Sequence, residues 1–470
     1  MAGETRRSRP GLEQRNILVI VSDTFRRDNL GVYGGDERIA PNLNRLAQQS
    51  SVFDRFYSCS FPTVPARADL LTGRAAFTRQ GWGPLNRAWS TIAELATARG
   101  YKTMGVTDVP FLLRSGYGYD RGFSVYIWVR GQPDRMHLDS SYDVVSMRRQ
   151  EADHCAPTTM RLAAEWLERQ AIGDDARPFL LVVDTWDPHE PWDAPSYYVR
   201  TYRPTYSGQT VPYPPYQEVG TALEDQDAVA LGRAAYLGKT TMVDAWIGYL
   251  LTRLEAVGYG ETTIVLFLTD HGFYFGEHNF FGKSIGWRIG PVSEERGAIG
   301  ELGRSPIYEE VCHIPLLVRV PGWEPTVVAG MACMPDVGAT VLDLVGADGR
   351  CEGMSLVGPG GRELVGPREF TVTSWPMHLP GHLTRAVDGA ARQFTGFMPM
   401  TVTTPEWSLL YASDQDAVEL YNLREDPQQV QNVAASNTEV VRMLHEMLVG
   451  FLRGAECPNA YLAPRLSVRV

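Results

Sequence analysis

The chain has 470 residues, of which 44% are hydrophobic and 21% charged, and its formal net charge is −11. This composition is that of an ordinary globular protein, long enough for one large core and a smaller appended unit. The acidic balance does not fit a nucleic-acid-binding domain, which is usually basic. An anionic substrate would therefore have to be held by local cations rather than by the overall field. The oligomeric state stays open, a homo-oligomer included.

Neither the N-terminal residues nor the cysteines indicate export. Residues 1–14 are polar and basic, without the apolar stretch of a signal peptide, and no apolar run reaches the length of a membrane span. No two of the six cysteines have CxxC spacing, which argues against a zinc knuckle and a disulfide framework. We therefore expect a reduced, cytoplasmic protein without a membrane partner.

Strands and helices alternate through the first three quarters of the chain. Asn16 to Ser22 is a continuous apolar run, typical of a central parallel strand. We expect further strands at 100–106, 179–183, 263–268 and 314–320, and helices at 41–49, 91–99, 157–170 and 234–257. This alternation predicts an α/β fold, in which a mostly parallel sheet is covered by helices on both faces.

The pattern changes after about residue 365. Short strands at 369–373, 409–412 and 417–422 and a helix at 437–453 predict a smaller C-terminal α+β subdomain. We therefore divide the chain into a catalytic domain, 15–360, and a C-terminal subdomain, 361–470. Residues 195–232 are rich in Tyr and Pro and are expected to form a long surface excursion, and residues 284–305 a loop over the site.

The stretch from Ser60 to Arg74, SFPTVPARADLLTGR, combines a hydroxyl group, a helix start and an arginine. Pro65 suits the first turn of a helix, which places Thr63 at a helix N-terminus, where free N–H groups and the dipole favour negative charge. Arg67 lies one turn further and can reach back to the same point. Such a site suits attack on a tetrahedral oxyanion, although a Pro-bounded turn before a buried helix explains the stretch equally well.

This stretch resembles the signature of the sulfatases, Cys-x-Pro-Ser-Arg followed by Leu-Thr-Gly-Arg. In that family the cysteine, sometimes a serine, is converted to formylglycine. This chain has Thr63 at the modified position and Ala66 at the serine position, and threonine is not a substrate for the conversion. Related phosphodiesterases and phosphatases of the alkaline-phosphatase superfamily use an unmodified Thr or Ser as nucleophile. The resemblance thus implies an alkaline-phosphatase-like fold and a nucleophilic Thr63.

Two acidic positions follow predicted strands. Asp23 comes at a carboxyl strand end, where open α/β sheets bind ligands, and Asp270-His271 could aim an oxygen and an imidazole at one ion. A helix cap and an exposed turn are the alternatives. The resemblance implies that Asp23, Asp270, His271 and Thr63 hold one divalent ion, Mn, Ca, Zn or Mg. Sulfatases usually carry Asp-Asp and Asp-Asn here, so this pattern is closer to the phosphonate monoester hydrolase and phosphodiesterase branch.

The resemblance also supplies groups that would contact the substrate. The segment 276–283 resembles Gly-Asp-His-x-x-x-x-Lys, so Lys283 would join Arg67 in stabilising substrate oxygens. The segment 184–191 resembles Asp-x-His-x-Pro, so His189 would assist the leaving group. Thr107 stands where sulfatases carry Lys-x-x-His and the monoester hydrolase branch carries hydroxyl residues. A solvated lysine and a loop histidine remain the alternatives.

A second metal ion is the rival assignment at His189. In two-metal phosphodiesterases an Asp and a His from this region bind a second ion, which here would be Asp187 and His189 with His378 or His382. Lys283 argues against this, because single-metal relatives place a lysine where the second ion would sit. Two arginines that follow Asp23, Arg26 and Arg27, lie either near the site or at the surface.

The resemblance spans about residues 15 to 455. It implies a metal-dependent hydrolase that cleaves a small anionic ester, a phosphodiester or phosphonate monoester and also a phosphate monoester, through a covalent phospho-threonine at Thr63. Sulfuric ester hydrolysis and transfer of the phosphoryl-type group to an alcohol are the alternative reactions. A catalytically inactive binding protein is the alternative that is not an enzyme.

Overall fold

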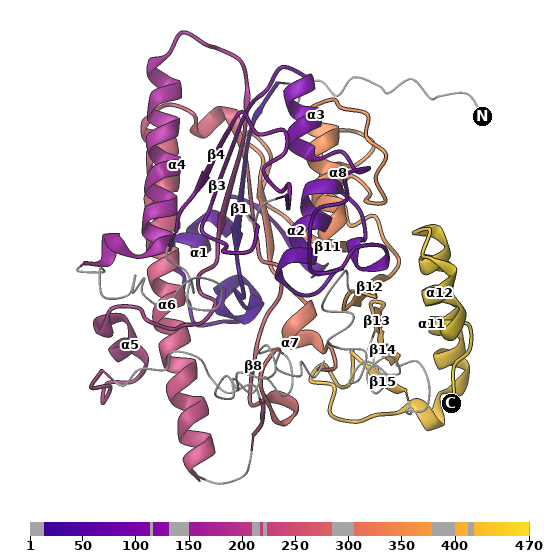
Figure 1. The fold of residues 1–470 in the computed structure, drawn as a ribbon. Coiled ribbons are helices and arrows are strands. Elements are labelled where there is room, and N and C mark those ends of the chain that lie inside the picture. The colour runs from indigo at the N-terminus through magenta and orange to yellow at the C-terminus, as the bar shows by residue number, and fades with distance from the viewer. Residues whose placement is uncertain are drawn as a thin grey trace, which may run out of the picture.

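An eight-stranded sheet forms the centre of the protein in the computed structural model (Figure 1). The structure describes residues 14–112, 116–130, 150–208, 217–219, 223–283, 305–377, 400–411 and 418–469. The strands follow the order β11-β2-β10-β7-β1-β5-β3-β4, and only β10 runs antiparallel to its neighbours. Their bounds are β1 (Asn16–Ser22), β2 (Ser51–Tyr57), β3 (Lys102–Thr107), β4 (Val125–Trp128), β5 (Phe179–Thr185), β7 (Thr263–Leu268), β10 (Leu316–Arg319) and β11 (Val327–Cys333).

Helices cover both faces of this sheet. On one face lie α1 (Pro41–Ala47), α4 (Cys155–Ile172) and α6 (Leu223–Ala256), and on the other α2 (Thr63–Thr72), α3 (Ile92–Ala98) and α8 (Met334–Leu344) (Figure 1). Alternate strand residues enter the two cores, which explains why the central strands are apolar throughout. The predicted α/β fold with a mostly parallel, doubly covered sheet is therefore confirmed. None of the helices in the described ranges has the length and apolar character that spanning a bilayer requires.

The region expected to be an irregular excursion is partly helical. Helix α6 begins at Leu223 rather than at 234, and α5 (Ser196–Tyr202) precedes it, so the expectation for 195–232 is wrong at both ends. The two helices approach closely at Gly238, where a Cβ atom would lie 2.9 Å from the backbone nitrogen of Val199. Packing between α5 and α6, rather than a periodic pattern in the Tyr- and Pro-rich segment, thus stabilises α5.

A small antiparallel sheet forms the C-terminal part, as predicted. Its strands are β12 (Thr371–Ser374), β13 (Met400–Thr403), β14 (Trp407–Tyr411) and β15 (Glu419–Asn422), in that order. Helix α11 (Thr438–Gly454) buries Leu444 and Leu448 in the core that these strands share with the main sheet. A bridge between Ser60 and Ser374 joins the small sheet to the segment before Thr63. The division of the chain at residue 360 stays a prediction.

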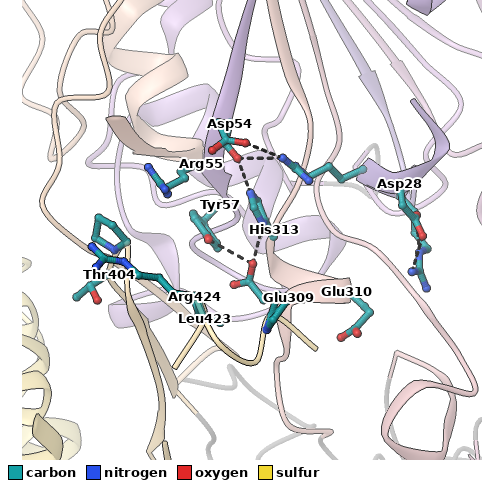
Figure 2. Close-up of a pocket in the computed structure, with 14 residues that line it drawn as sticks. Asp28, Asp54, Arg55, Tyr57, Glu309, Glu310, His313, Thr404, Leu423 and Arg424 are labelled. Atoms are coloured by element: carbon teal, nitrogen blue, oxygen red, sulfur yellow. Dashed lines mark hydrogen bonds and ion pairs between the residues drawn. The ribbon is translucent and has the colours of Figure 1, made fainter. Parts of the chain in front are cut away.

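A pocket of about 460 Å³ lies where β2 and α7 (Glu309–Cys312) meet loops of the C-terminal sheet (Figure 2). Inside it the Glu309 carboxylate accepts hydrogen bonds from His313 Nδ1 at 2.6 Å and from the Tyr57 hydroxyl at 3.3 Å. Arg27 lines the pocket and pairs with Asp54 at 3.1 Å. The described lining includes Arg26 as well as Arg27 but none of the residues expected to hold the metal ion or contact the substrate, so Arg27 lies at a surface apart from those residues.

The first prediction concerns the end of α2. Gly73 has φ of 64°, and a Cβ atom there would lie 2.8 Å from the Cβ of Cys351. Gly73→Ala should therefore destabilise the protein by roughly 2–4 kcal/mol, combining left-handed backbone strain and overpacking. Gly100 is the matched control, because it also has positive φ, 84°, but nothing within 4 Å. Gly100→Ala should cost about 1 kcal/mol. Equal shifts of the denaturation midpoint in both variants would contradict this.

Candidate active site

Three carboxylates meet at the carboxyl edge of the sheet, over α2. In β1, β5 and β7 the residues that face α2 include Val21, Val182 and Leu268, and Asp23, Asp184 and Asp270 each follow two positions later. Because side chains alternate along a strand and these strands are parallel neighbours, the three acids emerge on the same face. All three are buried.

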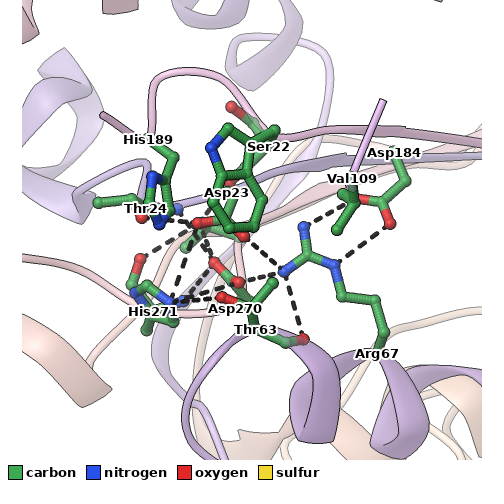
Figure 3. Close-up of polar contacts among 12 residues, drawn as sticks. Ser22, Asp23, Thr24, Thr63, Arg67, Val109, Asp184, His189, Asp270 and His271 are labelled. Atoms are coloured by element: carbon green, nitrogen blue, oxygen red, sulfur yellow. Dashed lines mark hydrogen bonds and ion pairs between the residues drawn. The ribbon is translucent and has the colours of Figure 1, made fainter. Parts of the chain in front are cut away.

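Arg67 of α2 lies between these carboxylates (Figure 3). Its Nε and Nη2 donate to the two oxygens of Asp184, at 3.2 and 2.8 Å. Its Nη1 donates to Asp23 at 2.9 Å and also to Asp270. The guanidinium, itself buried, thus links three strands to the helix that carries Thr63.

Asp23, Asp270 and His271 form a group that can hold a metal ion, with candidate ligand atoms within 4.8 Å of one another. The Nδ1 of His271 donates to the carbonyl of Gly272 at 2.9 Å, which leaves Nε2 free as a ligand. Burial lowers the pKa of His271 to about 3, so the imidazole is neutral, as a metal ligand must be. The Thr63 hydroxyl lies 3.4 Å from Nε2, so the four expected ligands are brought together.

The charges of this group fit a divalent cation. Burial and the neighbouring Asp270 raise the pKa of Asp23. Burial also acts to raise the pKa of Asp270, but the charge of Arg67, aided by a hydrogen bond from the Thr24 N–H at 3.0 Å, holds that pKa below its usual value. Arg67 can balance only one of the three buried carboxylates, and a buried charge without a partner is costly. A divalent ion bound by oxygen and imidazole ligands would balance the other two.

Lys283 reaches this group through Thr24, a residue for which we had expected no role. Lys283 follows β9 (Phe280–Gly282) and is buried. Its Nζ donates to the Thr24 hydroxyl at 3.2 Å, and that hydroxyl donates to Asp23 at 2.6 Å. Lys283 therefore lies beside the group rather than at the surface. Residues 284–304 of the expected loop over the site lie outside the described residues.

His189 is buried and held in one orientation. Its Nδ1 donates to the carbonyl of Glu190 at 2.7 Å, and its ring stacks on Trp186 with centroids 3.7 Å apart. Burial and the ammonium of Lys283 lower the pKa of His189 well below its usual value. The resting imidazole is therefore neutral, with Nε2 unprotonated. The Glu190 carboxyl lies 3.3 Å from Nδ1, where it would stabilise the imidazolium form.

One candidate ligand of the alternative second metal site, Asp187, is already engaged in an ion pair. Asp187 pairs with Lys239 of α6 at 2.8 Å, and both side chains are buried. The ammonium already neutralises the carboxylate that a second ion would need. The other residues of that assignment, His378 and His382, lie outside the described residues. The described contacts therefore favour a single ion.

Thr107 and Arg26 lie near Asp23, Asp270 and His271, but their described hydrogen bonds and ion pairs are made with other residues. Thr107 ends β3 in register with Asp184, and its hydroxyl accepts from the Val109 N–H at 3.1 Å. Arg26 pairs with Asp28 and Glu277, each at 2.7 Å. The choice left open for Arg26 thus resolves to a buried structural arginine that ties the loop after β1 to the segment before Lys283.

Asp184, like Thr24, is a residue for which the sequence motifs indicated no role. The signal was present in the alternation along β5, where Leu180 and Val182 enter the core on the α2 side. Asp184 is the next residue on that face, and β5 continues to Thr185 rather than ending at 183. A carboxylate on a core-facing position needs a buried cation, and Arg67 supplies it.

The fold and this site define an ester-bond hydrolase with an alkaline-phosphatase-like architecture. A family model described as Sulfatase matches residues 15–347, and the chain therefore belongs to the sulfatase family. An arylsulfatase of Clostridium perfringens is 22% identical, over 94% of this chain and 95% of the relative. Solved phosphonate monoester hydrolases of Agrobacterium radiobacter and Silicibacter pomeroyi superpose with TM-scores of 0.69 and 0.71.

Both structures are 20% identical to this chain and cover 94% of it, with 95% and 96% of their own chains matched. At this identity the two structures support the fold, and the family model supports membership. Members of the sulfatase family use a divalent metal ion, which agrees with the carboxylates and imidazole of Asp23, Asp270 and His271.

The second prediction concerns metal content. One ion per chain should be retained after equilibration with a divalent metal, and Asp270→Asn should lose it. Saturation at a hundredfold excess over Kd should add roughly 2.7 kcal/mol to the free energy of unfolding. Elemental analysis and the shift of the thermal midpoint on chelation measure both effects. Asp187→Asn is the control that should keep the ion. Two tightly held ions in the unmodified protein would contradict the single-ion site.

Proposed function

We propose that this protein is a metal-dependent hydrolase that cleaves a small phosphodiester or phosphonate monoester. The observation that carries this proposal is the Thr63 hydroxyl, 3.4 Å from the free Nε2 of His271, at the position where sulfatases need a cysteine or serine. A threonine cannot become formylglycine, so an unmodified hydroxyl is the nucleophile. The positive charge of Arg67 and Lys283 suits an anionic substrate. Cytoplasmic residence stays a prediction.

The residues at the site divide the chemistry between them. A bound Mg²⁺, Mn²⁺, Ca²⁺ or Zn²⁺, held by Asp23, Asp270, His271 and Thr63, would supply a lowered pKa for the Thr63 hydroxyl and charge neutralisation. Thr63 attacks phosphorus in line, the bond to the leaving oxygen breaks, and a phospho-threonine forms. Arg67 and Lys283 stabilise the equatorial oxygens. Water then releases the product and regenerates the hydroxyl.

His189 moves the protons in this scheme. With Nδ1 fixed on the Glu190 carbonyl, only Nε2 can exchange a proton with the reactants. In the first step Nε2 takes up a proton from solvent once the charge of the substrate, together with the Glu190 carboxylate, has raised the pKa of His189. It donates this proton to the leaving oxygen, while the proton of the Thr63 hydroxyl passes to solvent. In the second step Nε2 accepts the proton of the attacking water. Thr107, in register with Asp184, is proposed to contact a substrate oxygen.

Sulfuric ester hydrolysis is the second candidate, and the family match favours it. An activated threonine could attack sulfur in the same geometry. Two features argue against it: Thr63 replaces the formylglycine precursor, and residues 106–109 lack the Lys-x-x-His pair. Transfer of the phosphoryl-type group to an alcohol would use the same groups, with an acceptor in place of water.

The third prediction tests the substrate class. A panel of 4-nitrophenyl esters, comprising a phosphodiester, a phosphonate, a phosphate and a sulfate, is assayed with each divalent metal in turn. We expect the phosphodiester or the phosphonate to have the highest kcat/KM, at least tenfold above the sulfate. Product analysis with and without an added alcohol separates hydrolysis from transfer. A sulfate ester cleaved fastest would establish a sulfatase instead.

The fourth prediction concerns Thr63 itself. Thr63→Ala should bind metal and substrate yet lose the covalent adduct and nearly all turnover. Thr63→Ser should keep substantial activity, with a modest loss because serine lacks the methyl group that restricts χ1. Mass spectrometry of protein quenched during turnover should find a phosphoryl-type adduct on the peptide that contains Thr63. Full activity of Thr63→Ala, with no adduct in the unmodified enzyme, would mean that water attacks directly.

A further inference from the structure

Asp184 is a buried carboxylate that is held by Arg67 and does not belong to the group that can hold a metal ion. Its side chain is only 7% exposed. Both of its oxygens accept from the guanidinium, at 3.2 and 2.8 Å. A protonated carboxyl would carry a hydrogen on one of these oxygens, so the two bonds identify the ionised form. Burial raises the pKa of Asp184, and the ion pair with Arg67 opposes that rise. The two hydrogen bonds from the guanidinium place a carboxylate directly behind Arg67.

We propose that Asp184 sets the charge of the site, so that it accepts reacting groups with one negative charge and disfavours those with two. The proposal rests on the proposed function, in which Arg67 and Lys283 face the substrate. Phosphodiesters, phosphonate monoesters and sulfate esters carry one charge on the reacting group. Phosphate monoesters carry about two at pH 7, because their second pKa is about 6.

The charges around the site support this assignment. A divalent ion would balance Asp23 and Asp270, which leaves the two cations Arg67 and Lys283. Asp184 cancels one of them, so a single positive charge remains for the substrate. Among the described residues, the other charged groups near the site include Glu190, which lies beside His189, the pair of Asp187 with Lys239, and Arg26 with its partners Asp28 and Glu277. They are the same in an Asp184 variant and therefore do not affect a comparison with it.

The charge of Asp184 acts through one guanidinium. The same Arg67 side chain that donates Nε and Nη2 to Asp184 donates Nη1 to Asp23 and Asp270, where the substrate would bind. Because Asp184, Asp23 and Asp270 all contact the same guanidinium, they lie closer to one another than the screening length of about 10 Å at 0.1 M salt, and all three are buried. Removing the charge should therefore change the affinity for a second negative charge by roughly tenfold to a hundredfold.

Asp184 is a positioning residue in this account, because it acts through Arg67 and does not touch the substrate. Loss of orientation alone would lower the rates of all substrates by a similar factor. Loss of the negative charge would in addition favour the doubly charged substrate. The ratio of two substrates with the same leaving group separates these effects, because steps at the leaving oxygen cancel.

The fifth prediction is made for Asp184→Asn in the metal-loaded, full-length protein at pH 7. We expect the ratio of kcat/KM for 4-nitrophenyl phosphate to that for 4-nitrophenyl phenylphosphonate to rise at least tenfold, even if both values fall. An unchanged or lower ratio would overturn the proposal. Asp184→Ser removes the same charge with a smaller side chain, and it answers the question if the asparagine variant does not fold.

Asp69→Asn is the matched control, because Asp69 is another buried acid and lies on α2, the helix that carries Arg67. Asp69 is buried and accepts from Ser60 and Ala76 rather than from an arginine. None of these described hydrogen bonds joins Asp69 to Arg67, so the substitution leaves the carboxylate behind that arginine unchanged. For Asp69→Asn, the ratio of kcat/KM for the phosphate to that for the phosphonate should stay within about twofold of the value for the unmodified enzyme. A tenfold rise in this variant as well would assign the effect to packing and overturn the role of the charge.

Failure of the proposed function would remain distinguishable from failure of this inference. If the enzyme cleaves sulfate esters in place of phosphonates, 4-nitrophenyl sulfate becomes the singly charged reference, and the same ratio is measured against the phosphate monoester. A rise in that ratio on Asp184→Asn supports the role of Asp184 although the proposed phosphonate activity has failed. A constant ratio in an active enzyme overturns the role of Asp184 alone.

Discussion

The pairing of Arg67 with three carboxylates is the constraint on which the rest of the site depends. One guanidinium joins Asp184 on β5 to Asp23 and Asp270, which follow β1 and β7, at the centre of the sheet. Removing one partner of a buried pair typically costs about 3–5 kcal/mol, so the position of α2 on the sheet is strongly specified. Since Thr63 starts this helix, the same interaction aims the hydroxyl at the ligand group.

The fold and the positions of Asp23 and Asp270 could be predicted because they depend on short stretches of sequence. A central parallel strand is apolar on both faces, and NILVIVS and TIVLFL are recognisable for that reason alone. A polar residue directly after such a strand reaches the carboxyl edge of the sheet, so Asp23 and Asp270 could be placed without knowing their neighbours. The cap at Thr91 and Glu94 likewise marks the start of α3 within four residues.

The remaining contacts depend on partners that are distant in sequence. Asp184 meets Arg67 from 117 residues away, and the Thr24 hydroxyl meets Lys283 from 259 residues away. No local pattern distinguishes such a carboxylate or hydroxyl from a residue that caps a helix or faces water. Lys239 is a similar case, because its helix was expected but its pairing with Asp187 required the packing of α6 against the loop after β5. Short stretches of sequence thus place Asp23, Asp270 and His271, whereas contacts between distant segments determine how the charge of this group is balanced.

Two features of this chain offset each other in charge: Thr24 replaces the second aspartate of the usual sulfatase pattern, and Asp184 supplies a carboxylate beside Arg67. Where sulfatases usually carry a second aspartate after the first strand, Thr24 contributes a neutral hydroxyl, which bonds to both Asp23 and Lys283. The ligand group therefore holds one carboxylate fewer, and His271 is neutral as well. A carboxylate is nevertheless present nearby, on β5, where Asp184 pairs with Arg67 and lies outside the group that can hold a metal ion. Moving this charge from the ligand group to a position behind the arginine keeps the overall balance. An ion bound at this group, as proposed, would be shared by fewer anions, which would favour ionisation of an ordinary hydroxyl such as that of Thr63.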